Sequence, residues 1–159
     1  MSLLTVDGCN NYTVLGEADR AQESLLVSSP RCDRYDLASA GWYRFQGAAG
    51  DQMPDKCVPM NRCGTHAPGW LSGAHPTVAE GVVTRKVCYH WINNCCLWSN
   101  NITVRNCGAF FVYKLQKTPQ CYLRYCGNAS AGNLHCLLFW VCQWTIRHQA
   151  IIVINHLTF

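Results

Sequence analysis

The sequence has little charge and no concentrated block of it. Only 14% of its 159 residues are charged, and the thirteen lysines and arginines are scattered, with no basic run longer than Arg85-Lys86. Nucleic-acid-binding domains and polybasic membrane-surface segments gather positive charge on one stretch or face. Despite a net charge of +4, the sequence therefore predicts neither a nucleic-acid partner nor a polybasic membrane patch.

Long apolar segments are also missing. The longest uninterrupted one is Cys136–Cys142, whereas a membrane-spanning helix needs about 20 apolar residues. Residues 1–7 have no basic residue and only a few apolar ones, too few for the apolar region of a signal peptide. Either an export signal is missing or this chain is a piece of a longer protein, and we favour the second reading.

Cysteine, in contrast, is abundant. Twelve cysteines in 159 residues are typical of a disulfide scaffold in an oxidising, secreted or extracellular compartment. Ten of them lie between Cys9 and Cys126, an even number that can close five bridges without Cys136 and Cys142. Cys95 and Cys96 are neighbours, and a bridge between neighbours is strained, so we expect each to have a different partner. The other pairings stay open at this point.

Three sequons predict N-glycosylation at Asn11, Asn101 and Asn128. The β-branched run Ile102–Asn106 is expected to be a strand. Because Asn101 directly precedes this run, we expect its glycan at a turn and not inside a strand ladder.

The coarse organisation is β-rich. Strands are expected over 41–45, 81–91, 102–106, 110–115 and 121–126, with a turn at Asn93-Asn94 and a hairpin loop at 107–109. The stretch Cys57–Pro76 holds three prolines and three glycines and is expected to be a long ordered loop anchored by its cysteines and by Trp70. The predicted fold class is a small β-rich (α+β), disulfide-stapled extracellular domain with long ordered loops.

We divide the chain into an N-terminal extension (1–8), a cysteine-rich domain (9–127) and an apolar tail (128–159) that is expected to lie outside the fold. The tail has the order of a lipid-anchor signal, but its spacer is short and polar residues such as Arg147 interrupt it. An alternative or mis-spliced terminus is the preferred reading. Membrane attachment and the fate of Cys136 and Cys142 stay open.

Other chemistries compete for the same residues. Cys57, Cys63, His66 and His75 can be written as a Cys2His2 zinc set, but their spacing fits no compact pair of structural ligands. Cys63 with His66 could form a nucleophile and base, although nothing marks an oxyanion site. The expectation is therefore no metal, no cofactor and no catalytic residue. The aromatic residues Trp42, Tyr43, Trp70, Trp91 and Trp98 could line a sugar site, but such a density is more typical of a core.

With these residues laid out, residues 9–126 resemble the cysteine-rich domain shared by uromodulin and the zymogen-granule membrane glycoprotein. The resemblance rests on Cys32-Asp33, Gly41–Phe45, Met53-Pro54, Arg62–Pro68, Trp70-Leu71, His75-Pro76, Asn94–Cys96 and Leu123–Cys126, in this order. It implies the pairs Cys9–Cys107, Cys32–Cys121, Cys57–Cys95, Cys63–Cys126 and Cys88–Cys96. Relatives often carry a sequon where Ser72-Gly73-Ala74 stands here.

The resemblance also implies a function. In this family the domain is non-catalytic, and in its best-known members it belongs to a glycan-bearing module that fimbriated bacteria bind as a decoy. The expected partners are therefore glycan-binding bacterial adhesins or extracellular proteins, with the chain as part of a larger mosaic glycoprotein. A matrix or cell-surface protein-binding module is the first alternative. A secreted zinc hydrolase that uses His66, His75 and His90 is the second.

Overall fold

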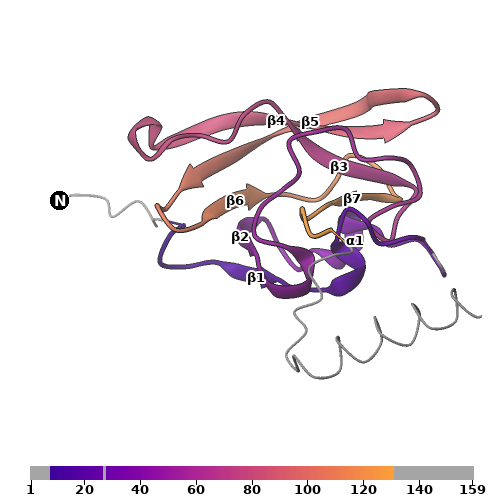
Figure 1. The fold of residues 1–159 in the computed structure, drawn as a ribbon, viewed down its shortest axis with the longest axis horizontal. Helices are drawn as coiled ribbons and strands as arrows, with labels where there is room; N and C mark the ends of the chain where they lie inside the picture. The colour runs from indigo at the N-terminus through magenta and orange to yellow at the C-terminus, as the bar shows by residue number, and fades with distance from the viewer. Residues whose placement is uncertain (1–7, 27, 131–159) are drawn as a thin grey trace, which may run out of the picture.

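The computed structural model describes residues 8–26 and 28–130, which form one seven-stranded sheet (Figure 1). Its strands are β1 Thr13–Leu15, β2 Gly41–Phe45, β3 Ala67–Ser72, β4 Val82–Trp91, β5 Asn94–Asn106, β6 Phe111–Leu115 and β7 Leu123–Tyr125. Across the sheet they lie in the order β1-β2-β6-β5-β4-β3-β7. Helical structure in the described residues is limited to α1 Asp33–Asp36 and the 3-10 turns η1 Ala18–Arg20, η2 Gly47–Ala49 and η3 Val78–Glu80. The β-rich, disulfide-stapled character is confirmed, whereas a single four-residue α-helix does not support the α+β description.

The long β4–β5 hairpin runs along one side of the molecule, at the top of Figure 1. It turns at Ile92 and Asn93, whose φ angles are 45° and 55°. Two consecutive positive φ angles are typical of the type I′ turn, whose twist matches that of the flanking strands. The turn lies one residue earlier than the expected Asn93-Asn94 pair. The second hairpin, β5–β6, turns through residues 107–110, one residue longer than the expected loop 107–109, and the Cys107 amide donates to the Phe110 carbonyl within it.

Part of the expected long loop is a strand. β3 lies between β4 and β7, with Pro68 and Gly69 near its start. Pro68 is tolerated because the register pairs between β3 and β4 begin only at Gly69. A Cβ on Gly69 would lie 2.7 Å from the Tyr89 ring and 2.8 Å from the Arg124 carbonyl oxygen, so close packing between strands requires glycine here. The expectation of an uninterrupted loop was wrong because these two residues serve tertiary contacts that local composition does not reveal.

The core lies on one face of the sheet and contains fully buried side chains from six strands, among them Phe45, Leu71, Tyr89, Val104, Tyr113 and Tyr125. The buried tyrosine hydroxyls have partners: Tyr89 donates to Asn100 Oδ1 at 2.8 Å, and Tyr113 accepts from the Met53 amide at 3.0 Å. Burial raises the pKa of both phenols. They therefore stay protonated and act as fixed polar anchors within an apolar core.

Five disulfides surround this core and join Cys9 to Cys107, Cys32 to Cys121, Cys57 to Cys95, Cys63 to Cys126 and Cys88 to Cys96. These are the pairs that the resemblance implies. Four of them connect residues 38 to 98 positions apart, and in the chain-entropy model closing a loop of about 100 residues contributes roughly 4–5 kcal/mol. Such bridges stabilise the many irregular segments between the strands.

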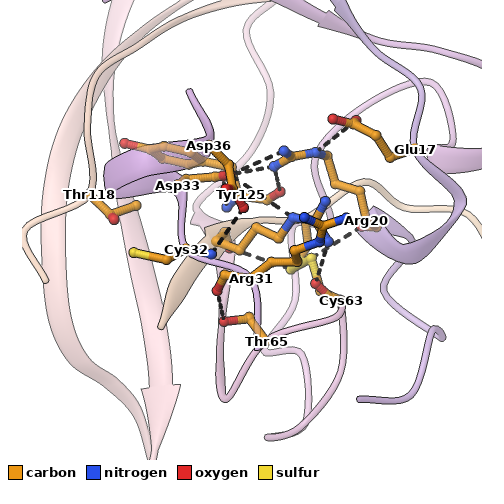
Figure 2. A network of polar contacts seen from close by, with 12 residues as sticks. Glu17, Arg20, Arg31, Cys32, Asp33, Asp36, Cys63, Thr65, Thr118 and Tyr125 are labelled. Carbon is orange, nitrogen blue, oxygen red and sulfur yellow. Dashed lines mark hydrogen bonds and ion pairs between the residues drawn. A yellow bond between two sulfur atoms is a disulfide. The ribbon is translucent and has the colours of Figure 1, made fainter. Parts of the chain in front are cut away.

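A buried ion pair connects the N-terminal segment to the end of the domain (Figure 2). The Arg20 guanidinium donates to both carboxylate oxygens of Asp33, at 2.7 and 3.1 Å, and to the Tyr125 carbonyl oxygen at 3.0 Å. Asp33 also accepts from the Tyr125 amide at 2.8 Å. Both charged side chains are at most 1% exposed. Burial alone would lower the pKa of Arg20, but the charge and hydrogen bonds of Asp33 more than offset this and raise it.

The packed region continues to Ala129, slightly beyond the expected domain end at residue 127. Ala129 is buried, and its amide donates to the Ala49 carbonyl at 3.2 Å. The rest of the expected tail, residues 131–159, lies outside the described residues, as do residues 1–7 of the expected extension.

His75 is half-buried beside β6. Its Nε2 lies 2.8 Å from the Tyr113 hydroxyl, and its ring lies 4.5 Å from the Phe111 ring centroid. The Tyr113 hydroxyl also accepts from the Met53 amide, and the direction of its hydrogen bond with His75 depends on the imidazole tautomer. Burial lowers the pKa of His75, although the charges of Asp55 and Asp51 partly oppose this.

The disulfide assignment predicts a specific peptide map. Proteolysis of the folded, non-reduced protein followed by mass spectrometry should recover Cys57 linked to Cys95 and Cys88 linked to Cys96. A Cys95–Cys96 bridge, or free thiols at most of the ten paired positions, would contradict the assignment.

Replacement of the buried carboxylate should be strongly destabilising. We expect Asp33→Asn to lower the free energy of unfolding by about 3–5 kcal/mol, because the Arg20 charge stays buried with only the half-exposed Glu17 as counter-charge. Denaturant unfolding with intact disulfides measures this difference. Glu23→Gln is the matched control: its ion pair with Arg62 is long, at 3.9 Å, and largely exposed, so a change below about 1 kcal/mol is expected. Equal effects of the two variants would contradict the structural role of Asp33.

The lowered pKa of His75 predicts that acid reduces stability. Above its ordinary pKa the imidazole is neutral in the folded and unfolded states, so it gives no pH dependence. As the pH falls below about 6.5, the unfolded chain takes up a proton before the folded protein does, and stability decreases until the folded-state pKa is reached. Unfolding measured between pH 8 and 5 should show a smaller loss for His75→Gln than for the wild type. Identical pH profiles would contradict this prediction.

Candidate functional site

The three sequons lie in different structural settings. Asn11 is exposed in the loop that precedes β1. It lines a cavity of about 250 Å³ together with Trp42 and Tyr43. A glycan on this side chain would project from the surface beside the β1–β2 edge of the sheet.

Asn101 lies inside a strand ladder, so the expected turn position was wrong. It belongs to β5 and is the register partner of Lys86 in β4, with its side chain exposed. The strand begins at Asn94, eight residues before the β-branched run that predicted it, because pairing with β4 extends over almost the whole hairpin. Polar residues are tolerated on the outward face of such a strand.

Asn128 is half-buried and has a structural role of its own. Its Oδ1 accepts from the Asp51 amide at 3.0 Å, and its backbone amide donates to the Gln52 carbonyl at 2.8 Å. The Gln22 side chain donates to the Asn128 carbonyl at 2.8 Å. Among the described residues, Asn128 Nδ2, the atom to which a glycan attaches, has no hydrogen-bond partner, so a glycan there is compatible with the contacts of Oδ1.

The cysteines of the zinc and nucleophile hypotheses are oxidised in this structure. Cys57 is bonded to Cys95 and Cys63 to Cys126, and a disulfide sulfur is neither a thiolate ligand nor a nucleophile. The same holds for the cluster of Cys57, His90 and Cys95, whose potential ligand atoms lie within 4.8 Å of one another. His90 Nδ1 lies 2.8 Å from the Val58 carbonyl oxygen and therefore donates to it.

The histidines of the hydrolase hypothesis have separate surroundings. His66 lies 3.1 Å from Asn61 Oδ1 and contacts the rings of Trp91 and Tyr122. His75 contacts Tyr113 and Phe111. Their partners differ from each other and from those of His90, so the described contacts give no convergent catalytic set.

The aromatic residues considered for a sugar site are also divided between settings. Tyr43 is 3% exposed, whereas Trp42, Trp70, Trp91 and Trp98 are half-buried. Trp70 Nε1 donates to the Cys95 carbonyl at 2.8 Å, and Trp91 and Trp98 pack against the core cluster. Trp70, Trp91 and Trp98 therefore pack on or within the β4–β5 hairpin, which agrees with the interpretation that these aromatic residues belong to the core.

A surface groove lined by both charged and aromatic side chains, which we call the mixed groove, lies over the Cys32–Cys121 disulfide. It was not expected from the sequence. It has a volume of about 670 Å³, and its lining includes Asp19, Arg31, Tyr35 and Tyr122. Tyr35 and Tyr122 are 75% and 49% exposed. Burial alone would raise the pKa of Asp19, but hydrogen bonds and charges from Arg124 and Arg31 lower it, so this carboxylate is ionised. Two parts of the chain that are far apart in sequence meet here, Asp19 with residues 28–36 on one side and residues 121–122 on the other, which is why no local motif indicated the groove.

The described residues include no helix that is long and apolar enough to span a membrane.

Comparison with known proteins indicates the family to which this fold belongs. The family profile of the uromodulin-like domain matches residues 43–127. The pancreatic secretory granule membrane major glycoprotein GP2 of Canis lupus familiaris is 50% identical over 131 residues, which is 82% of this chain and 25% of that protein. Rattus norvegicus GP2 is 46% identical over 134 residues, 82% of this chain and 24% of that protein.

Uromodulin of Rattus norvegicus is 44% identical over 135 residues, which cover 84% of this chain and 20% of that protein. The chain thus spans about a quarter or less of the length of these relatives. It belongs to the uromodulin-like domain family of secreted or cell-surface glycoproteins.

Proposed function

We propose that this chain is a non-catalytic recognition module whose N-glycans at Asn11, Asn101 and Asn128 are bound by bacterial adhesins, so that it acts as a decoy. The observation that carries the proposal is the setting of the sequons: Asn11 and Asn101 are exposed on a disulfide-stapled sheet, in a family of glycoproteins. The described histidines and cysteines offer no catalytic arrangement that competes with this reading.

The rigid frame supports glycan presentation. Asn101 is held by its β4–β5 ladder, and Asn128 by its contacts with Asp51 and Gln52. Glycans on fixed elements keep a constant spacing, and several attachment points on one protein increase avidity when the adhesins are themselves clustered. The parent protein would act as a multivalent competitor for bacterial attachment.

A second function, protein binding at a matrix or cell surface, is favoured by the mixed groove. Exposed tyrosines are enriched at protein interfaces because they combine a large apolar ring with a polar hydroxyl. Tyr122 is additionally held in place, since the His66 ring packs edge-on against it at 5.4 Å. This surface is independent of the three sequons and can be tested separately.

Removal of the glycans should abolish capture by a mannose-specific fimbrial adhesin. We would combine Asn11→Gln, Asn101→Gln and Ser130→Ala, because the last change deletes the third sequon while it keeps the structural contacts of Asn128. Immobilised adhesin should capture the wild type and not the triple variant, after a peptide map has shown intact disulfides in both.

The matched control tests the groove. Tyr35→Ala with Tyr122→Ala changes the exposed protein surface and leaves all sequons in place, so adhesin capture should stay at the wild-type level. Full capture of the triple glycan variant, with loss of capture in the double tyrosine variant, would refute glycan-borne recognition and favour the protein surface.

A further inference from the structure

The β4–β5 hairpin leaves one side of β5 unpaired over much of its length. β5 pairs with β4 from Asn94 to Arg105 but with β6 only from Thr103 to Asn106. Among the described residues, no strand pairs with the outer side of Asn94–Ile102. This segment is therefore an open strand edge, which we call the β5 edge.

The direction of the backbone groups on the β5 edge follows from the β5–β6 hairpin. The Cys107 amide donates to the Phe110 carbonyl, so Cys107 directs its backbone groups toward β6. Because this direction alternates along a strand, Arg105 and Thr103 also face β6. Asn101, Ser99 and Leu97 then present their amides and carbonyls on the same side, beyond the end of β6.

Apart from the register irregularity between the pairs Trp91–Asn94 and Tyr89–Trp98, the β5 edge lacks the usual protection against strand pairing. Natural edge strands are very short or carry lysine, other charges or proline. β1 and β7, at the two ends of the sheet, are protected in the first way, since each has three residues. Asn94–Ile102 is longer and contains neither a charged residue nor a proline, and Leu97 is 42% exposed.

The middle sequon lies within this edge. The side chain of Asn101 is exposed, and its backbone groups lie on the side of β5 that no described strand pairs with, where its carbonyl accepts only from the Asn100 side-chain amide at 3.4 Å. An N-linked glycan is bulky and strongly hydrated. Attached here, it would occupy the space that an added strand needs.

We propose that the Asn101 glycan covers the β5 edge and prevents it from pairing with the same edge of a second copy of this chain. A second copy fits because antiparallel pairing about a two-fold axis places the same segment on both sides, and exposed edges recruit strands through main-chain hydrogen bonds. This inference rests on glycosylation of Asn101, which belongs to the proposed function, but it assigns that glycan a different task from adhesin binding.

The test compares the self-association of two single-glycan deletions. Asn101→Gln removes the glycan on the β5 edge, whereas Asn11→Gln removes one from a loop and is the matched control. Sedimentation velocity over a concentration series should show Asn101→Gln forming dimers with an apparent dissociation constant at least about tenfold below that of the wild type. Asn11→Gln should remain as monomeric as the wild type.

A rescue variant separates edge pairing from a general loss of solubility. Ser99→Lys, added to Asn101→Gln, places a charge in the middle of the edge without restoring the glycan. It should return the protein to the monomer. Self-association that persists with Ser99→Lys, or a monomeric Asn101→Gln variant at every concentration, would overturn the proposal.

Misfolding of Asn101→Gln is excluded by a second route that starts from folded protein. The Asn11→Gln, Ser130→Ala variant carries only the Asn101 sequon, and an endoglycosidase can trim its glycan to one sugar after folding. Trimming should induce the same dimerisation, and an unchanged monomer would count against the proposal. Mass spectrometry of the starting protein must show Asn101 occupied, because a monomeric wild type with a bare Asn101 would also overturn it.

Adhesin capture measured on the same samples distinguishes the two ideas. If capture does not follow the glycans while Asn101→Gln still self-associates, the decoy function fails and the edge role stands. If capture follows the glycans while all variants stay monomeric, only the edge role fails.

Discussion

The pairing of Arg20 with Asp33 is the constraint on which the closure of the domain depends. The sheet alone leaves the N-terminal segment and β7 as short pieces with few ladder bonds. Asp33 accepts from Arg20 and from the Tyr125 amide, and so fixes η1, α1 and β7 at one point. A buried pair of this kind is costly to break but adds little net stability compared with apolar packing. Its contribution is therefore mainly to specify one arrangement of segments that are irregular in themselves.

Around this point, disulfides and tyrosines replace the regular structure that the chain lacks. The Cys32–Cys121 bridge joins the same two parts of the chain as the hydrogen bond from the Tyr125 amide to Asp33, since Cys32 directly precedes Asp33 and Cys121 lies shortly before β7. The tyrosine hydroxyls of the core connect strands to loops, as Tyr113 does with Met53 and His75. The result is a rigid frame that is cross-linked by disulfides and by buried hydrogen bonds. The side chains of Asn11, Asn101 and Tyr35 are exposed on this frame, which suits a module that recognises or is recognised.

The sequence predicted the strands with strong local signals and missed features made by distant contacts. β2 and β6 were predictable because aromatic and β-branched residues dominate Gly41–Phe45 and Phe111–Leu115. β3 was not, because Pro68 and Gly69 have the composition of a loop and are explained only by the Tyr89 ring and β7. The position of Asn101 was wrong for a related reason: Trp98–Asn101 is polar and irregular in pattern, and its strand conformation comes from β4. The groove beside Tyr122 required the Cys32–Cys121 contact, which composition alone could not specify.

The neighbouring cysteines of β5 have a further consequence for the choice of disulfide isomer. Successive side chains of a strand point to opposite faces, so Cys95 and Cys96 are separated by the pleat, and each meets a different partner, Cys57 or Cys88. A slip of one residue in the hairpin would exchange the two faces and present each sulfur to the wrong partner. The register of the hairpin, including the irregularity between the pairs Trp91–Asn94 and Tyr89–Trp98, thereby decides which of two adjacent and chemically identical thiols is oxidised with which segment.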